Sequence, residues 1–149
     1  MQTFLYRLYQ LFIFFPLFIV VTILVALITT LGCMVGLSRW FVFGPSRFWG
    51  WFTIRALFLP VKVEGRERLQ RGQSYIFAAN HQGAFDIFLL SGFLGREFKW
   101  MMKASLRKLP FVGYACKKAG FIFVDKSSRK AVAKTMDDAR QRLVGGTSL

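Results

Sequence analysis

The stretch LFIVVTILVALITTLGCMVGL, residues 17–37, contains no charged side chain and has the length of a bilayer-crossing helix. It lies in a longer uncharged run of 31 residues, 8–38, which would measure about 46 Å as one helix against a hydrocarbon core of roughly 30 Å. Pro16 is expected to divide this run, and we place the spanning helix at about residues 11–37. The alternatives, a buried core helix and a cleaved signal peptide, fit less well, because the run is apolar on every side and too long.

A second apolar segment, residues 40–60, contains Arg47 and Arg55 together with three of the four Trp residues. Trp and Arg side chains are typical of the headgroup zone of a membrane, and two arginines disfavour a full span. We therefore expect an interfacial helix at about residues 46–59, and a membrane anchor formed by residues 1–60.

The two apolar segments are expected to form a helical hairpin. Its turn is predicted either at Gly44-Pro45 or near residues 36–38. The pair Gly32-x-x-x-Gly36 either packs two helices together or marks a helix end. Only Arg7 precedes the apolar run, whereas many cations follow it, so the rest of the chain is expected to face the cytoplasm, at the inner membrane of a bacterium.

The composition combines high apolarity with high positive charge. Of the 149 residues, 54% are hydrophobic and 17% aromatic, and the formal net charge is +14. The aromatic content excludes a disordered basic tail, and the lack of repeats excludes a collagen-like or coiled-coil rod. Dispersed cations beside an apolar anchor argue against nucleic acid and favour a membrane with anionic partners. With one His and only Cys33 and Cys116, the chain lacks the ligands for a zinc site and the count for a disulfide framework.

From residue 61 the pattern alternates between strands and helices, which predicts an α/β sheet domain. The expected strands are residues 61–64, 74–79, 98–102 and 121–124, and the expected helices are residues 84–92, pieces of 105–118 broken at Pro110 and Gly113, and a final helix. The final helix is expected to begin at a Ser127 or Ser128 cap, to bury Val132, Met136, Ala139 and Leu143, and to stop at Gly145-Gly146. About 85 residues are thin for a sheet covered on both faces, so an incomplete domain is expected.

The run Asn80-His81-Gln82-Gly83-Ala84-Phe85-Asp86 lies between an expected strand and an expected helix. On one helix His81 and Asp86 would point about 140° apart, so they meet only if His81 is in the turn and Asp86 folds back from the first helical turn. A carboxylate on one ring nitrogen fixes the tautomer and leaves the other nitrogen as a base for an alcohol proton. No Ser or Cys is adjacent to act as a covalent nucleophile, so direct transfer to a substrate hydroxyl is predicted. The alternative is a histidine with a structural role only.

Three ordered blocks carry a resemblance to a known family. The His81-x4-Asp86 pair resembles the His-x4-Asp motif of the glycerolipid acyltransferases, and most of all that of the 1-acylglycerol-3-phosphate acyltransferases. Residues 120–126, GFIFVDK, are similar to the family's Gly-x-Ile-Phe-Ile-Asp-Arg block. Between them, residues 103–113 follow its Lys-x-x-Leu and Pro-x-x-Gly patterns. The resemblance covers residues 61–144, and it implies that residues 61–149 form the N-terminal part of an incomplete mixed-sheet acyltransferase domain with flanking helices.

The resemblance implies transfer of a fatty acyl group from acyl-CoA or acyl carrier protein to the sn-2 hydroxyl of lysophosphatidic acid, giving phosphatidic acid for phospholipid biosynthesis. It implies no metal and no cofactor, and membrane lipids are the further partners. The implied catalytic residues are His81, the general base, and Asp86, its orienting partner. The implied substrate-binding residues are Asn80, Lys103, Gly120, Phe121 and Lys126. Two alternatives stay open: another glycerolipid or lysophospholipid acceptor, and a noncatalytic protein that binds anionic lipid. The oligomeric state stays open.

Two departures from the family pattern matter. The family's second block usually ends in Arg, whereas Lys126 stands here and offers a point charge in place of a bidentate fork. The family's third block, Glu-Gly-Thr-Arg, and its fourth, proline-centred block are absent, so the chain is expected to be truncated at its C-terminus. A chain without these blocks need not be active by itself.

Overall fold

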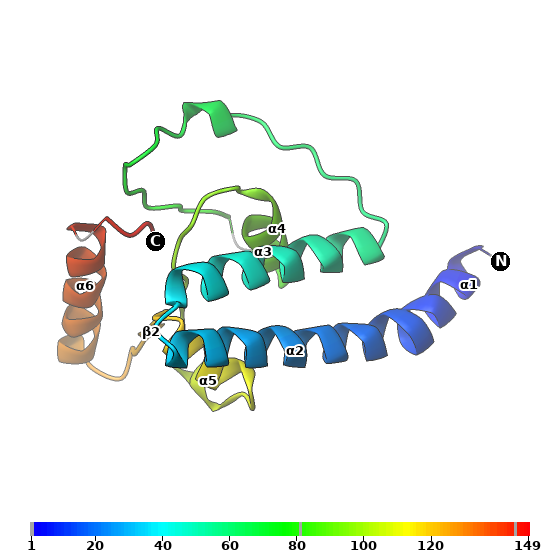
Figure 1. The fold of residues 1–149 in the computed structure, drawn as a ribbon, viewed down its shortest axis with the longest axis horizontal. Coiled ribbons are helices and arrows are strands. Elements are labelled where there is room, and N and C mark those ends of the chain that lie inside the picture. The colour runs from blue at the N-terminus through cyan, green and yellow to red at the C-terminus, as the bar shows by residue number, and fades with distance from the viewer. Residues whose placement is uncertain (1, 81, 145) are drawn as a thin grey trace.

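A long helical hairpin organises the computed structural model, which describes residues 2–80, 82–144 and 146–149. Figure 1 shows the two helices of the hairpin side by side, with a small sheet and the remaining helices around one end and one side of them. The elements are α1 (Gln2–Tyr9), a π-helical turn (Gln10–Phe14), α2 (Phe15–Met34), α3 (Ser38–Ala56), a 3-10 turn (Arg66–Arg68), α4 (Phe85–Phe93), β1 (Met101–Lys103), a 3-10 helix (Ala104–Lys108), α5 (Val112–Lys118), β2 (Ile122–Val124) and α6 (Arg129–Val144).

The N-terminal apolar segment is one continuous helical rod, so the expectation that Pro16 divides it is wrong. Pro16 lies in the first turn of α2, directly after the π-helical turn, in which the Phe15 N–H donates to the Gln10 carbonyl. The π-turn adds a residue just where proline cannot donate a hydrogen bond, so the rod continues. The rod runs beyond the expected range of residues 11–37 at its N-terminal end and stops short of it at Met34. In the described ranges, Thr3–Met34 is the one helix long and apolar enough to cross a membrane.

The hairpin turns at Gly36, one of the two predicted positions. Gly36 has a φ of +81°, and the Leu37 N–H donates to the Gly32 carbonyl at 2.9 Å, which closes α2 with a Schellman motif. Gly44-Pro45 lies inside α3, so the alternative turn is wrong. Gly32 both packs the two helices and helps to end α2. A side chain at this position would collide with the Phe41 ring of α3, and the Gly32 carbonyl accepts the Leu37 N–H that closes α2.

Helix α3 is longer than the expected interfacial helix at residues 46–59, and one of its faces is deeply buried. Thr53 and Ile54, each 1% exposed, are its most buried side chains. Where α3 crosses α4, a Cβ on Gly50 would lie 2.5 Å from the Phe88 carbonyl oxygen, and one on Gly92 would collide with the Trp51 backbone. The two helices therefore touch backbone to backbone, which only glycine permits.

The sheet is small and parallel. β1 pairs with β2, and Phe98 bridges Ser148 in parallel. Leu149 continues this pairing on its other side, because its N–H donates to the Tyr75 carbonyl at 2.9 Å and its carbonyl accepts from the Phe77 N–H at 2.7 Å. Four segments thus lie side by side in the order 75–77, 148–149, 98–103 and 122–124.

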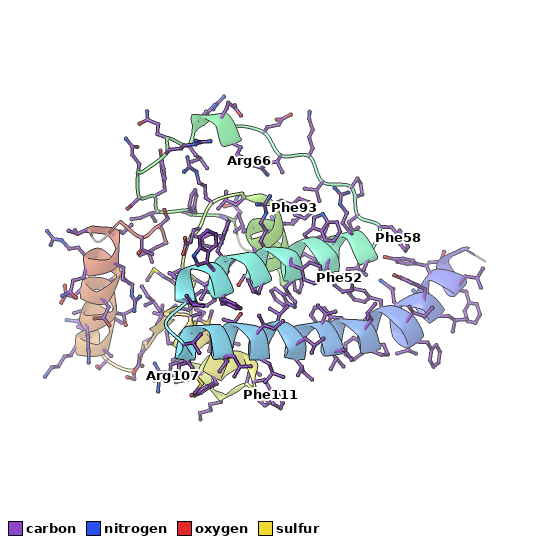
Figure 2. The ribbon with its side chains drawn as sticks, in the orientation of Figure 1. Phe52, Phe58, Arg66, Phe93, Arg107 and Phe111 are labelled. Atoms are coloured by element: carbon purple, nitrogen blue, oxygen red, sulfur yellow. The ribbon has the colours of Figure 1, made fainter. Side chains whose placement is uncertain are left out.

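Two of the expected strands differ in the structure. Residues 61–64 form no strand, because they belong to a long connection that leaves α3 and runs over the hairpin (Figure 1). Among the described residues, the backbone of residues 75–77 pairs with Leu149, and Ile76 is 70% exposed, so this segment is not covered on both faces as expected. The connection is held to the body by the Arg66 guanidinium, which donates to the Phe93 carbonyl at the end of α4 (Figure 2).

The helices of the second half follow the prediction with two exceptions. Helix α4 forms where expected, and residues 105–118 are broken at Pro110, between the 3-10 helix and α5. Gly113 does not break a helix, because it lies in the first turn of α5 and packs against the Arg107 carbonyl. Helix α6 begins after Ser128, whose Oγ accepts the Ala131 N–H at 3.1 Å.

The buried face of α6 is rotated from the expected one. Thr135 and Ala139 are buried, whereas Met136 is 48% exposed. Leu143 packs as expected, against a core of Ile122, Ala139 and Leu149. The helix ends in a Schellman motif around Gly146, with a φ of +85°. Gly145, the other predicted stop residue, lies outside the described residues. The expected class, an apolar helix or two-helix hairpin followed by an α/β unit, is confirmed. The strand pairs in the described ranges are all parallel, so no antiparallel pair among them makes the expected mixed sheet.

The close approach of α3 and α4 predicts the effect of adding one methyl group. Gly50→Ala should destabilise the protein by about 1–3 kcal/mol, because the new Cβ meets a backbone carbonyl that cannot move aside. The measurement is the thermal unfolding midpoint in detergent. Gly44→Ala is the matched control in the same helix, where a Cβ meets open space and should stabilise by about 0.5–1 kcal/mol. Equal midpoints for the two variants would contradict the backbone contact.

Candidate active site

Several predicted site residues lie at one edge of the sheet. Because the paired segments are parallel, their carboxyl ends point the same way. Asn80 follows the segment 75–77, Lys103 ends β1, and Lys126 comes two residues after β2. The side chains of these three residues are exposed, so this edge presents an amide and two ammonium groups to solvent.

Asp86 holds the turn at the start of α4. Its Oδ2 accepts the Gln82 N–H at 2.7 Å and the Gly83 N–H at 3.1 Å. A carboxylate in the first turn of a helix that reaches back to preceding N–H groups fastens the entry of the helix. The carboxylate therefore folds back toward the turn, as the sequence predicts. His81 lies outside the described residues, so its meeting with Asp86 stays a prediction.

A large apolar cavity begins beside Asp86 and Lys103. Its volume is about 760 Å³, and it lies between the hairpin, α4, α5 and β1. The cavity thus extends from the Asp86 carboxylate and the Lys103 ammonium to helix α2, and most of its lining is apolar. Its lining includes Thr22, Val25, Ala26 and Thr29 of α2, Trp49 of α3, Ile87, Leu90 and Ser91 of α4, Val112, Ala115 and Cys116 of α5, and Met101 and Met102 of β1.

An aromatic cluster lies beside this cavity where α2, α3 and α4 meet, and its Trp49 side chain lines the cavity. The Trp49 indole N–H donates to the Thr22 hydroxyl at 2.9 Å, which joins α3 to α2. The Trp49 and Phe88 ring centroids lie 4.6 Å apart, and those of Phe18 and Phe88 lie 5.7 Å apart. These edge-on contacts tie α4 to both helices of the hairpin. The apolar N-terminal helix α2 is thus part of the cavity wall, which the sequence did not reveal.

The carboxyl end of β2 carries a fixed carboxylate and a guanidinium. Asp125 accepts the Ser127 N–H at 2.8 Å, and this hydrogen bond holds the pKa of its carboxyl below the usual value, with a smaller contribution from the Arg107 charge. The Arg107 Cζ lies 4.8 Å from the centroid of the Phe123 ring. Arg107 was not among the predicted site residues, although its position four residues after Lys103 is a signal visible in the sequence.

Gly120 and Phe121 lie at the opposite end of β2 from Lys126. Gly120 has a φ of +77°, and the Phe121 N–H donates to the Cys116 carbonyl at 3.0 Å, which closes α5. Phe121 lines the cavity, and its ring centroid lies 6.0 Å from the Lys99 Nζ. The structure therefore gathers Asn80, Asp86, Lys103 and Lys126 at one edge and places this pair away from it.

Besides Asp86 and Lys103, the cavity wall contains two further titratable groups, those of Lys99 and Cys116. Burial lowers the pKa of the Lys99 ammonium, with an opposing effect from Glu97. Burial also raises the pKa of the Cys116 thiol to about 11. Both follow from placing an ionisable group beside an apolar space. No group of three or more His, Cys, Asp or Glu that could hold a metal ion occurs within residues 2–80, 82–144 and 146–149.

Comparison with known protein families shows to which family the chain belongs. The model of the acyltransferase family matches residues 60–149, and the chain belongs to that family. The resemblance seen in the sequence blocks is thereby confirmed at the level of the acyltransferase family. No solved structure matches the chain.

Curated relatives bear the corresponding name. A 1-acyl-sn-glycerol-3-phosphate acyltransferase of Saccharomyces cerevisiae is 32% identical over 102 residues, which cover 63% of this chain and 33% of the relative. One of Chlamydomonas reinhardtii is 27% identical over 88% of this chain and 38% of its own. One of Helicobacter pylori is 26% identical over 46% of this chain and 29% of its own. The chain thus spans about a third of the length of the curated relatives it matches.

The buried thiol predicts slow alkylation. In a Cys33→Ser variant, which leaves Cys116 as the single thiol, iodoacetamide at pH 8 should react about a hundredfold more slowly with the folded than with the urea-unfolded protein, because thiolate is scarce. The rate should rise about tenfold per pH unit up to about pH 10. The measurement is adduct formation by mass spectrometry. Equal rates in the two states would show that Cys116 is not in the cavity wall.

Proposed function

We propose that this chain forms the membrane anchor and the His–Asp part of a 1-acylglycerol-3-phosphate O-acyltransferase. The protein would transfer a fatty acyl group from acyl-CoA or acyl carrier protein to the sn-2 hydroxyl of lysophosphatidic acid, for phospholipid biosynthesis. The observation that carries the proposal is the Asp86 carboxylate. It is bound to the two backbone N–H groups that follow His81, beside an apolar cavity of about 760 Å³ that reaches α2.

In the proposed reaction His81 acts as the general base. It takes the proton of the acceptor hydroxyl while the hydroxyl oxygen attacks the thioester carbonyl carbon of the donor. The tetrahedral intermediate then breaks its C–S bond, and the leaving thiolate takes the proton from the imidazolium. Asp86 holds the imidazole in one tautomer and stabilises its positive charge. Asp86 is suited to this, because its carboxylate is already anchored by the turn.

The cavity suits a fatty acyl chain. Its volume is within the range of about 300–1,000 Å³ typical of ligand sites, and its walls are mostly aliphatic and aromatic. A chain that lies in it would run from the thioester near Asp86 toward α2. Burial of each methylene group is worth about 0.8 kcal/mol, so an apolar cavity of this size favours long chains over short ones.

The cations at the carboxyl edge of the sheet suit the acceptor phosphate. We assign the phosphate to Lys103 and Lys126, with Asn80 as a hydrogen-bonding neighbour. Both lysines are exposed, and Lys103 lines the cavity near Asp86. Gly120 and Phe121 would act less directly, by turning the chain into β2 and so fixing the position of Lys126.

The hairpin suits a membrane surface. The outer face of α2 is exposed and apolar over its whole length, at Leu17, Val20, Leu24, Leu27, Leu31 and Met34. The connection after α3 carries six charged residues between 62 and 71 and returns alongside the hairpin to the sheet (Figure 1). A chain segment with charged side chains cannot cross hydrocarbon at low cost, so we place the turn and the open end of the hairpin on the same side of the membrane. The outer face of α2 would then lie in the cytoplasmic leaflet of a bacterial inner membrane.

Charge on the outer face of α2 tests the membrane assignment. Leu24→Asp combined with Leu31→Asp should move most of the protein from carbonate-washed membranes into the soluble fraction, because two carboxylates must enter the hydrocarbon. Lys134→Asp, on the exposed surface of α6, is the matched control and should leave the distribution unchanged. An unchanged distribution for the double variant would place this face away from the membrane.

Acyl transfer tests the reaction. The protein in isolated membranes should transfer a radiolabelled acyl group to lysophosphatidic acid, and both His81→Ala and Asp86→Asn should lower kcat by about 10²–10⁴-fold, the range of general acid–base catalysis. Gln82→Ala is the matched control, because its exposed side chain is not used and its backbone N–H remains.

Each other outcome has its own meaning. Undiminished transfer by His81→Ala would refute the general-base role. Transfer by the wild type to another glycerolipid or lysophospholipid, but not to lysophosphatidic acid, would identify a different acceptor. Salt-sensitive lipid binding with no transfer to any acceptor would identify a noncatalytic lipid-binding protein.

A further inference from the structure

We propose that Arg107 binds the phosphate monoester of the acceptor, through two parallel hydrogen bonds from the edge of its guanidinium. This inference rests on the proposed function and adds a specificity-determining residue to it. Arg107 belongs to the 3-10 helix Ala104–Lys108, which directly follows β1, and Figure 2 labels it near α5 and β2.

The Arg107 guanidinium lies over the ring of Phe123. Its Cζ lies 4.8 Å from the centroid of the Phe123 ring, and Phe123 is the middle residue of β2. The same charge acts on Asp125, one residue beyond β2. The guanidinium therefore lies at the carboxyl end of β2, next to the segment that carries Lys126.

The guanidinium lies on the face of the sheet that α4 covers. The Trp100 indole N–H donates to the Ser91 hydroxyl of α4 at 3.3 Å, so Trp100 points to the side of the sheet that α4 covers. Met102, two residues on, points to the same side, and it pairs with Phe123 in the parallel register. Phe123 and the guanidinium on its ring thus lie on the α4 side, which is also the side of Asp86.

The Arg107 backbone is tightly packed. Gly113, in the first turn of α5, packs so closely on the Arg107 carbonyl that a Cβ there would collide with it. The ring of Phe123 supports the guanidinium from one face, and this stacking leaves the N–H groups in the guanidinium plane accessible. A supported, pre-positioned side chain loses less entropy when it binds a ligand.

The Arg107 guanidinium has no carboxylate partner among the described residues. Within the described ranges the one ion pair joins Lys62 to Glu64, so no Asp or Glu oxygen there lies within 4.0 Å of the Arg107 guanidinium. Asp125, the acidic group at this edge of the sheet, is turned to the Ser127 N–H. An exposed guanidinium without a carboxylate, beside two lysines, is suited to an external anion.

The difference between Arg and Lys side chains favours Arg107 as the residue that orients the bound phosphate. Lys103 and Lys126 offer point charges, which attract a phosphate from any direction. A guanidinium offers a planar fork that matches two phosphate oxygens and so fixes the orientation of the bound group. The phosphate could come from the acceptor or from an acyl-CoA donor. We assign it to the acceptor, because Arg107 shares the α4 side of the sheet with Asp86.

The test uses steady-state kinetics of the protein in isolated membranes, with lysophosphatidic acid and acyl-CoA varied separately. Arg107→Met, which keeps an apolar chain over Phe123, should raise KM for lysophosphatidic acid at least tenfold and leave KM for acyl-CoA within twofold, because a charge-assisted pair of hydrogen bonds is lost. Arg107→Lys should recover only part of this loss. Arg140→Met, on the exposed surface of α6, is the matched control and should change neither constant.

Two outcomes overturn the assignment. A rise in KM for acyl-CoA with an unchanged KM for the acceptor would give the guanidinium to the donor phosphates. Unchanged constants for both substrates would remove Arg107 from the site.

A binding measurement separates this inference from the proposed function. In lipid nanodiscs, Arg107→Met should weaken equilibrium binding of lysophosphatidic acid about tenfold and leave binding of uncharged monoacylglycerol unchanged, whether or not turnover occurs. Equal weakening of both ligands would point to a disturbed cavity and would overturn the proposal. Absence of acyl transfer by the wild type, with this selective loss of binding intact, would reject the reaction and keep the phosphate contact.

Discussion

The contact on which the rest of the arrangement depends is the crossing of α3 and α4 at Gly50 and Gly92. With no side chain between them, the backbone of a hairpin helix touches the backbone of α4, the helix that carries Asp86 in its first turn. The Trp49 and Phe88 rings pack beside this crossing and extend it to the cavity. The distance between the apolar hairpin and the candidate catalytic carboxylate is thereby fixed by two glycines, and α2 becomes a wall of the cavity.

Much of the fold could be predicted from local pattern. The charge-free run predicted a helical hairpin, and Gly36 was one of the two expected turn positions. Helix α4, strand β2 and the Ser128 cap of α6 also formed where local sequence favours them. These features depend on residues close to one another in the chain, so they can be recognised from the sequence alone.

The failures involve contacts between distant residues. Proline usually interrupts a helix, but a π-turn before Pro16 absorbs the lost hydrogen bond, and no residue preference reveals that. Thr135 is buried and the predicted Met136 is exposed, because α6 is rotated about its axis so that its other face packs on β2. In the site, the backward fold of Asp86 was predictable from the turn residues. The cavity was not, because its walls come from many elements that lie far apart in the sequence. The geometry of His81 remains a prediction.

The pairing of Leu149 with Tyr75 and Phe77 has a consequence for how the molecule assembles. These partners are more than 70 positions apart along the chain, and the same short segment also bridges Phe98. During synthesis the backbone of segment 75–77 therefore cannot pair with Leu149 until residues 148–149 leave the ribosome, while the hairpin is complete much earlier. High contact order of this kind slows folding. The hairpin can therefore form first, and the sheet closes afterwards against helices that are already in place.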